Sequence, residues 1–154
     1  MSELLDLGLF PLDRPLEQEA LEDYIALQWV LPYVLKRSNV GNKSSDYFHW
    51  ATRMACDSAV SPSPIRSWYD RKIRKSVENS IYYEDNPRTA LAMRKYIPPQ
   101  FRPSAAKAIY ELFNTQRVYD PCGGWGDRMA GAMACGVNHY HCRDVNPLVF
   151  SGYA

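Results

Sequence analysis

The sequence lacks the features that would place it in a membrane or outside the cell. Its 154 residues contain no apolar run approaching the roughly 20 residues that span a bilayer. The N-terminus, Met1–Asp6, carries acids where a secretory signal carries bases. The cysteines are few and scattered, which argues against a disulfide framework: Cys56, Cys122, Cys135 and Cys142. We therefore expect a soluble cytoplasmic protein without a membrane partner.

The chain has almost no net charge, but the formal value of +1 hides an asymmetry. Residues 1–25 hold seven acids and one base, a net of −6, whereas residues 66–102 hold nine bases and four acids, a net of +5. Within the basic part, cations interleave with Trp68 and Tyr69. This pattern suits contact with DNA phosphates and bases. The five cations that would make the contact are Arg66, Arg71, Lys72, Arg74 and Lys75.

A second interpretation of the basic part remains open. On one helix, the apolar residues Ile65, Trp68, Tyr69 and Ile73 mostly share a side, so they could be a core stripe opposite a solvated charged face.

Residues 1–100 are predicted to be mostly helical, a region that would contact DNA or cover a site. Helical spacing predicts a helix over residues 16–37, kinked or ended at Pro32. Ser45 is predicted to cap a second helix that carries Tyr47, Phe48, Ala51 and Met54. Ser63-Pro64 and Asn86-Pro87 are cap-and-proline pairs. They predict one helix through the basic part and another to about Tyr96.

Residues 101–154 show a different, α/β pattern. Ser104 is predicted to cap a helix to Phe113, with Ala108, Ile109, Leu112 and Phe113 facing inward. Strands are predicted over 117–120 and 138–142, and between them a helix over 126–135 ended by Gly136. Asn146-Pro147 opens a further helix. This order predicts the start of a doubly wound, Rossmann-like sheet, which is incomplete because two strands are too few.

The strand ending at Asp120 is followed by Gly123-Gly124-Trp125-Gly126. Glycines allow positive φ and close approach of a ligand to the backbone, and the following helix N-terminus favours an anionic group. Asp144 follows 24 positions after Asp120, where parallel-sheet nucleotide sites place a ribose-binding acid. The glycine spacing fits neither Gly-x-Gly-x-x-Gly nor a Walker loop. An unrelated glycine turn is the alternative.

The segment Asp120-Pro121-Cys122-Gly123-Gly124-Trp125-Gly126 resembles motif I of the amino-group (adenine-N6 and cytosine-N4) DNA methyltransferases, which are class I enzymes dependent on S-adenosylmethionine (SAM). Phe101-Arg102-Pro103 with its helix resembles motif X, and Arg143–Pro147 resembles motif II. The resemblance covers residues 101–154. The form Asp-Pro-Cys-Gly-Gly-Trp-Gly-Asp-Arg resembles a phage-type variant, which implies the cytoplasm of a host cell.

The resemblance implies a SAM site and a role for each matching residue. Gly123, Gly124 and Gly126 would line the methionine moiety, in the loop that includes Pro121 and Cys122. Asp120 would approach the amino group, Asp144 would bind the ribose and Phe101 would pack on the cofactor. Trp125 and Asp127 depart from the small or hydroxyl residues common in this group, so their roles stay open.

The sequence lacks the Asp/Asn/Ser-Pro-Pro-aromatic motif that holds the target amine in this group, and neither Ile97–Gln100 nor Asn146–Val149 matches it. We therefore expect the first part of a truncated or split DNA methyltransferase, with adenine-N6 the favoured specificity of the intact enzyme. We expect this part to be inactive alone and to be completed by a second polypeptide. The alternatives are a non-catalytic SAM-binding or partner-completing subunit, or a methyltransferase for RNA or small molecules.

The histidines and cysteines do not predict a metal site. Cys122, Cys135, His139, His141 and Cys142 fall close together but lack the spacing of zinc ligands. His49 is interpreted as a histidine at the edge of the core in preference to a catalytic base.

Overall fold

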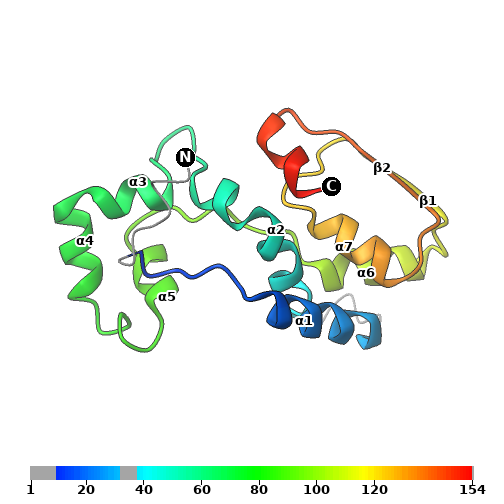
Figure 1. Ribbon diagram of the computed structural model, residues 1–154, viewed down its shortest axis with the longest axis horizontal. Helices are drawn as coiled ribbons and strands as arrows, with labels where there is room; N and C mark the ends of the chain where they lie inside the picture. Colours follow the sequence, from blue (N-terminus) through cyan, green and yellow to red (C-terminus); the bar gives the residue numbers. More distant parts are fainter. Residues whose placement is uncertain (1–9, 32–37, 154) are drawn as a thin grey trace. The chain divides into compact units, whose positions relative to one another are not determined.

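The computed structural model describes residues 10–31 and 38–153 as a mixed α/β structure, mostly helical, with one small parallel sheet (Figure 1). The chain divides into two compact units, which are described separately. The first unit contains residues 10–14 and Ala51–Pro99, and the second contains Pro15–Trp50 and Gln100–Ala154. One unit boundary lies within a residue of the division expected at residue 100, but Pro15–Trp50 group with the C-terminal segment. No helix in the described part of the chain is long and apolar enough to cross a bilayer.

The first unit is built around Trp68. Besides the end of α2 (Asn42–Met54), it contains α3 (Pro64–Tyr69), α4 (Arg71–Glu78) and α5 (Pro87–Ala92). Trp68 packs with Val77, Ala90 and Leu91 in the buried core of this unit. The Phe10 ring meets the Trp68 ring edge-on, the Tyr83 ring stacks on it, and Leu12, Ile73 and Ile97 pack around this core.

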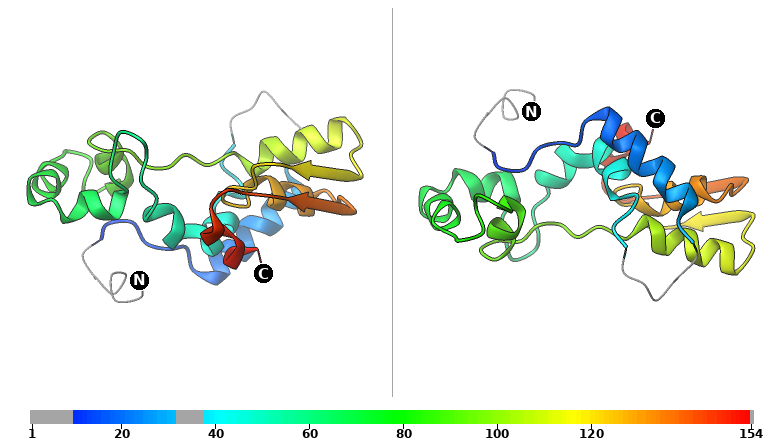
Figure 2. Two further views of the ribbon diagram at one scale, coloured as in Figure 1. Left: turned by 90° about the horizontal axis from the view of Figure 1, so that it is seen from above. Right: turned by 90° about the horizontal axis from the view of Figure 1, so that it is seen from below.

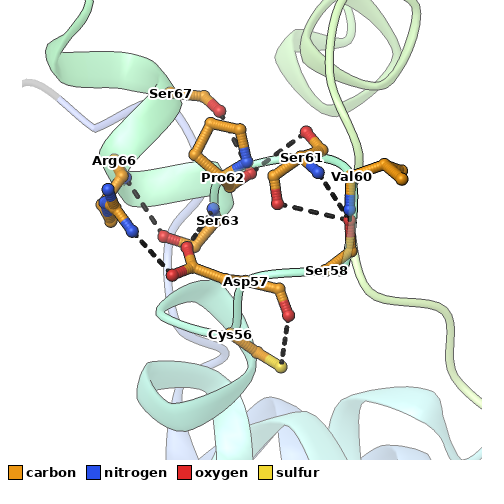
Figure 3. A network of polar contacts seen from close by, with 9 residues as sticks. All are labelled: Cys56, Asp57, Ser58, Val60, Ser61, Pro62, Ser63, Arg66 and Ser67. Atoms are coloured by element: carbon orange, nitrogen blue, oxygen red, sulfur yellow. Dashed lines mark hydrogen bonds and ion pairs between the residues drawn. The ribbon is translucent and has the colours of Figure 1, made fainter.

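The turn before α3 is held by its own polar side chains (Figure 3). The Asp57 carboxylate accepts hydrogen bonds from the Ser63 backbone N–H at 2.7 Å and from the Arg66 guanidinium at 2.6 Å. The Ser58 hydroxyl accepts from the backbone N–H groups of Val60 and Ser61. These contacts fix the chain direction entering α3, a common use of Asp and Ser in turns.

Both predicted cap-and-proline signals are confirmed. The Ser63 hydroxyl accepts from the Arg66 N–H, and the Asn86 side chain accepts from the Thr89 N–H at 2.9 Å. The single helix expected through the basic part is wrong, because Asp70 separates α3 from α4. The extended backbone of Asp70 ends one helix, while its carboxylate caps the next. The helix predicted from Asn86-Pro87 to about Tyr96 is shorter in the structure, since α5 ends at Ala92.

The second unit contains the sheet and the helices around it. Its elements are α1 (Glu17–Trp29), the first part of α2, α6 (Pro103–Leu112), β1 (Arg117–Asp120), α7 (Asp127–Ala134), β2 (His139–Cys142) and the 3₁₀ helix η1 (Pro147–Gly152). The strands pair in parallel, from Arg117 opposite His139 to Asp120 opposite Cys142. Figure 2 shows the strands side by side, and α6 and α7 pack against each other beside them.

Several predicted helix ends in the second unit need correction. The predicted helix over 16–37 is confirmed as α1 only to Trp29, and residues 32–37 lie outside the described residues. Ser45 does not cap α2, which begins three residues earlier, and its hydroxyl turns to Asp127. Ser104 does not cap α6, which begins one residue earlier at Pro103, and its hydroxyl donates to the Ser38 carbonyl. Both hydroxyls donate to partners distant in sequence, and the Ser45 hydroxyl also lies within hydrogen-bond distance of the Asn42 carbonyl.

The end of α7 agrees with its prediction. Gly136 has φ +74°, and its N–H donates to the Met133 carbonyl. The next N–H, from Val137, reaches back to the Ala132 carbonyl. This pair of bonds is a Schellman motif, in which a left-handed residue closes the helix and satisfies its last carbonyls.

One face of the sheet and one end of α6 are exposed. Side chains alternate along the strands, so Tyr119 and His141 are exposed and stack with ring centroids 5.7 Å apart. Ala108 is buried as predicted, but the inward placement of Ile109, Leu112 and Phe113 is wrong. They are 37%, 68% and 74% exposed. The physical reason is that a sheet of two strands offers α6 too little surface to cover its last turn.

Candidate functional site

The glycine loop, residues 121–126, connects the C-terminal end of β1 to the N-terminus of α7. Gly124 and Gly126 have φ values of +60° and +76°, a region that side chains disfavour. Gly126 is the N-cap of α7, so the loop turns directly into the helix. The backbone at these two positions therefore explains the glycines that the sequence showed.

Asp120, at the end of β1, stabilises the loop through hydrogen bonds to both of its carboxylate oxygens. One carboxylate oxygen accepts from the Cys122 N–H at 3.1 Å and from the Arg128 guanidinium at 3.2 Å. The other accepts from Arg128 Nε at 2.8 Å and from the Tyr140 hydroxyl at 2.5 Å. Burial raises the pKa of Asp120, but these hydrogen bonds outweigh burial and lower it overall. Asp120 is thus fully engaged within the protein, and its observed role is to fix the loop.

Arg128 is a site residue that the sequence reasoning missed. It lies in the first turn of α7, pairs with Asp120 and also donates to the Cys122 carbonyl. Its guanidinium lies over the Phe101 ring, 5.4 Å from the centroid, so it joins Phe101 to the loop. Burial lowers the pKa of Arg128, but the hydrogen bond and charge of Asp120 outweigh this and raise it. The available signal was an Arg eight positions after a strand-ending Asp.

Asp144 lies directly opposite the loop, two residues after the end of β2. One carboxylate oxygen accepts from the Gly124 N–H at 2.7 Å and the other from the Asn146 N–H at 2.8 Å. A carboxylate has about four acceptor positions, so Asp144 keeps acceptor capacity beyond these two bonds. The structure therefore brings the two acidic residues singled out in the sequence to the same loop, one on each side.

Two further side chains, Tyr153 and His49, pack against the glycine loop. The Tyr153 hydroxyl donates to the Gly124 carbonyl at 2.5 Å, and a Cβ on Gly123 would lie 2.7 Å from that hydroxyl oxygen. The His49 ring touches Gly126, and its Nε2 lies 3.1 Å from the Val149 carbonyl. Burial lowers the pKa of His49 despite the opposing effects of nearby carbonyls and of Asp46. His49 is thus fully buried, and not at the edge of the core where the sequence placed it.

The remaining loop residues differ in exposure. Pro121 and Cys122 are exposed, and Gly123 is buried with its N–H donated to the Arg143 carbonyl. Trp125 is partly buried, beside α1 and α2.

Asp127, whose role the sequence left open, is buried and joins α7 to α2. Its carboxylate accepts from the Ser45 hydroxyl at 2.5 Å and from the Gln100 amide at 3.3 Å. Gln100 also reaches the Asn42 carbonyl at 3.2 Å. These bonds fasten the start of α2 to the helix that follows the glycine loop.

The five basic residues singled out in the sequence lie in the first unit, and they differ in their ion pairs and exposure. Arg66 pairs with Asp57, and Arg74 pairs with Glu78 and lies over the Trp68 ring. Trp68 itself is buried in the core, so its ring is not available to stack on a base. The side chains of Arg71, Lys72 and Lys75 are exposed. The core-stripe interpretation therefore holds for Trp68, and Arg71, Lys72 and Lys75 are the exposed cations of α4.

No cluster of three or more metal-ligating side chains occurs among residues 10–31 and 38–153. The four cysteines are free thiols. Burial raises the pKa values of Cys56, Cys135 and Cys142, which favours their protonated form.

Comparison with known proteins gives no relative for this chain: no family model, curated protein or solved structure matches it. The functional interpretation therefore rests on the motifs and on the geometry of the loop.

Proposed function

We propose that the glycine loop binds SAM and that this chain carries the cofactor-binding part of an amino-group DNA methyltransferase, with adenine-N6 the favoured specificity. The single observation that carries the proposal is the position of Asp144. Its carboxylate lies at the carboxyl end of the strand parallel to β1 and contacts the Gly124 N–H at 2.7 Å. An acid at that position beside a glycine loop suits ribose hydroxyls. The order β1, loop, α7, β2 supports a Rossmann-like start.

The residues present fit such a cofactor. Gly124 and Gly126 have positive φ and no side chains, so the backbone of the loop is open to a ligand. The N-terminus of α7 begins at the end of this loop. Asp144 has spare acceptor capacity for a ribose. Phe101, 41% exposed, offers a ring surface, while Asp120 and Arg128 hold the loop and that ring together. Bound SAM supplies an electrophilic methyl group for direct displacement by an amine.

Tyr153 bears on entry to the loop. Its hydroxyl occupies the space next to Gly123 and bonds the Gly124 carbonyl. A ligand that contacts these two glycines must share that space or displace the hydroxyl. Tyr153→Phe removes the oxygen while keeping the ring, so SAM affinity should rise or stay unchanged.

Isothermal titration calorimetry of the full chain with SAM tests the proposal. Asp144→Asn should weaken binding at least roughly tenfold, the scale of one lost charge-assisted hydrogen bond. Asp85→Asn, on an exposed turn of the first unit, is the matched control and should bind SAM normally. Val145 is fully exposed beside Asp144, so Val145→Arg should preserve the fold and place a competing cation beside that carboxylate, which should weaken binding modestly.

Absence of binding by a folded wild-type chain would overturn the SAM assignment. So would equal affinity of wild type, Asp144→Asn and Val145→Arg, since the site would then not depend on Asp144. Thermal unfolding of each variant shows whether a loss of binding reflects a loss of folding.

We also propose that the exposed cations Arg71, Lys72 and Lys75 contact DNA phosphates. Their exposure supports this, because cations paired within the protein contribute less to a phosphate contact. Replacing the three by alanine should weaken salt-dependent DNA retention and reduce its salt slope. The same replacement of the paired Arg66 and Arg74 should have a smaller effect. Equal retention by all variants would leave α4 with a solvated charged face.

The target amine needs residues that this sequence does not contain, so the proposal assigns cofactor binding, and not catalysis, to these residues. The sheet supports a partner for this purpose. Tyr119 and His141 are exposed on one face, whereas parallel strands are normally buried on both faces. We propose that a further polypeptide adds strands to the edge of the sheet and packs helices on this face in an active enzyme.

A further inference from the structure

A pocket of about 500 Å³ lies within the second unit, bordered by α1, α2 and α7. Its volume falls in the range of small-molecule sites, roughly 300–1,000 Å³. The wall carries four aromatic residues and two thioethers: Tyr24, Tyr47, Phe48, Trp125, Met129 and Met133. Trp125 and Gly126 belong to the glycine loop, whereas Gly123, Gly124 and Asp144 do not line the pocket. The pocket is therefore separate from the proposed ribose site, although it shares one wall with the loop.

The composition of the wall favours an aromatic ligand. Aromatic side chains and methionine sulfur pack favourably on planar rings. Tyr47 and Phe48 already meet edge-on, with centroids 5.1 Å apart. The hydroxyls of Ser44 and Ser45 also line the pocket, but they donate to the Gly41 carbonyl and to Asp127. The lining as a whole is mostly apolar, so a strongly polar ligand would lose more hydration than it would regain in hydrogen bonds.

The charge of the wall disfavours an anion. Glu17 is the charged residue among the lining residues that the structure describes. The cation at the start of α2, Lys43, is paired with Glu19 at 2.7 Å and does not line the pocket. An anionic ligand would meet a like charge without a compensating one, whereas a neutral ring would not.

We propose that this pocket binds an uncharged aromatic molecule. The inference goes beyond the proposed function, because it concerns a second ligand and would stand if the loop did not bind SAM. Because Trp125 and Gly126 form part of both sites, occupancy of the pocket should also change the affinity of the loop for its own ligand.

Two dyes with the same ring system test the proposal on the full chain by fluorescence titration. Phenylnaphthylamine is neutral, and anilinonaphthalene sulfonate adds one negative charge. The neutral dye should bind at least roughly tenfold more tightly, because the sulfonate would be desolvated beside Glu17. Glu17→Lys should narrow this difference by strengthening binding of the sulfonate dye.

A pocket-filling variant locates the dye. Ala130 lines the pocket on α7, so Ala130→Phe should abolish binding of the neutral dye. Ala92→Phe makes the same change at an exposed position of α5 in the first unit and should leave binding unchanged. Calorimetry with SAM on the same samples shows separately whether the glycine loop binds its ligand, so a loss of dye binding can be distinguished from a loss of SAM binding.

Three results would overturn the inference. The first is equal affinity for the two dyes, which indicates general apolar adsorption. The second is unchanged dye binding in a folded Ala130→Phe variant. The third is a dimer, detected by sedimentation, that Ala130→Phe dissociates. This result would show that a second copy of the chain occupies the pocket.

Discussion

Replacing Arg128 by methionine should destabilise the second unit through Asp120. The Arg128 side chain is 28% exposed and that of Asp120 is 6% exposed, so the change leaves a buried carboxylate without its charged partner. Breaking a fully buried pair in this way costs about 3–5 kcal/mol. Here Asp120 keeps its bonds from Tyr140 and Cys122, and Arg128 is partly hydrated. We therefore expect a loss of about 2–3 kcal/mol in the free energy of unfolding at pH 7.

Urea unfolding at pH 7, combined with amide hydrogen exchange of β1 and β2, measures this loss. Arg74→Met is the matched control, because its pair with Glu78 is about one-third exposed on both sides, and its loss should cost no more than about 1 kcal/mol with the Trp68 ring contact included. The double variant Asp120→Asn/Arg128→Met should recover part of the loss, since the neutral amide removes the unpaired charge.

The pH dependence gives a second measurement of the same effect. The folded pKa of Asp120 lies below its ordinary value of 3.8, so the folded state binds fewer protons than the unfolded state. Its stabilisation is present above pH 3.8 and is lost as the pH falls through the folded pKa. Arg128→Met should weaken this dependence. A cost equal to that of Arg74→Met, or no recovery in the double variant, would refute the assignment of Asp120 and Arg128 as the support of the loop.

Three further predictions concern stability. Lys107→Met should cost about 1–3 kcal/mol in urea unfolding, because Lys107 is 4% exposed and paired with Glu111, whereas Lys43→Met, at a pair 54% and 41% exposed, should cost less than about 1 kcal/mol; equal costs would contradict this reasoning. Gly131→Ala should lower the melting temperature more than Gly136→Ala. A Cβ at Gly131 would lie 2.7 Å from a backbone oxygen, whereas a Cβ at Gly136 would meet open space and would cost only the strain of a left-handed φ. The reverse order would show that the helix packing is misassigned. Stability should fall as the pH drops below about 6.5, the ordinary pKa of His49, because burial lowers its folded pKa and the unfolded chain then binds the proton more readily, and His49→Gln should flatten this fall; an unchanged slope would assign the pH dependence to other groups.

The sequence predicted the local elements well where near neighbours decide them. The caps at Ser63 and Asn86, the two strands and the left-handed Gly136 all depend on hydrogen bonds or backbone angles within a few residues. It also placed Asp120 and Asp144 correctly at the ends of parallel strands, because chain order and strand direction fix which ends meet.

The capping errors arose because two helices begin earlier than the sequence predicted. Ser45 and Ser104 are good caps by composition, yet α2 begins at Asn42 and α6 at Pro103, and the two hydroxyls donate to Asp127 and to the Ser38 carbonyl.

The sequence by itself thus determined the order of helices and strands and the glycines that the loop requires. Only the tertiary structure decided that Pro15–Trp50 group with the sheet, that Tyr153 lies against the loop, and that α1, α2 and α7 enclose a pocket. The physical reason is that a cap or a turn is set by bonds between neighbours in the chain. The partners of a buried charge and the walls of a pocket depend on which distant surfaces meet when the chain folds.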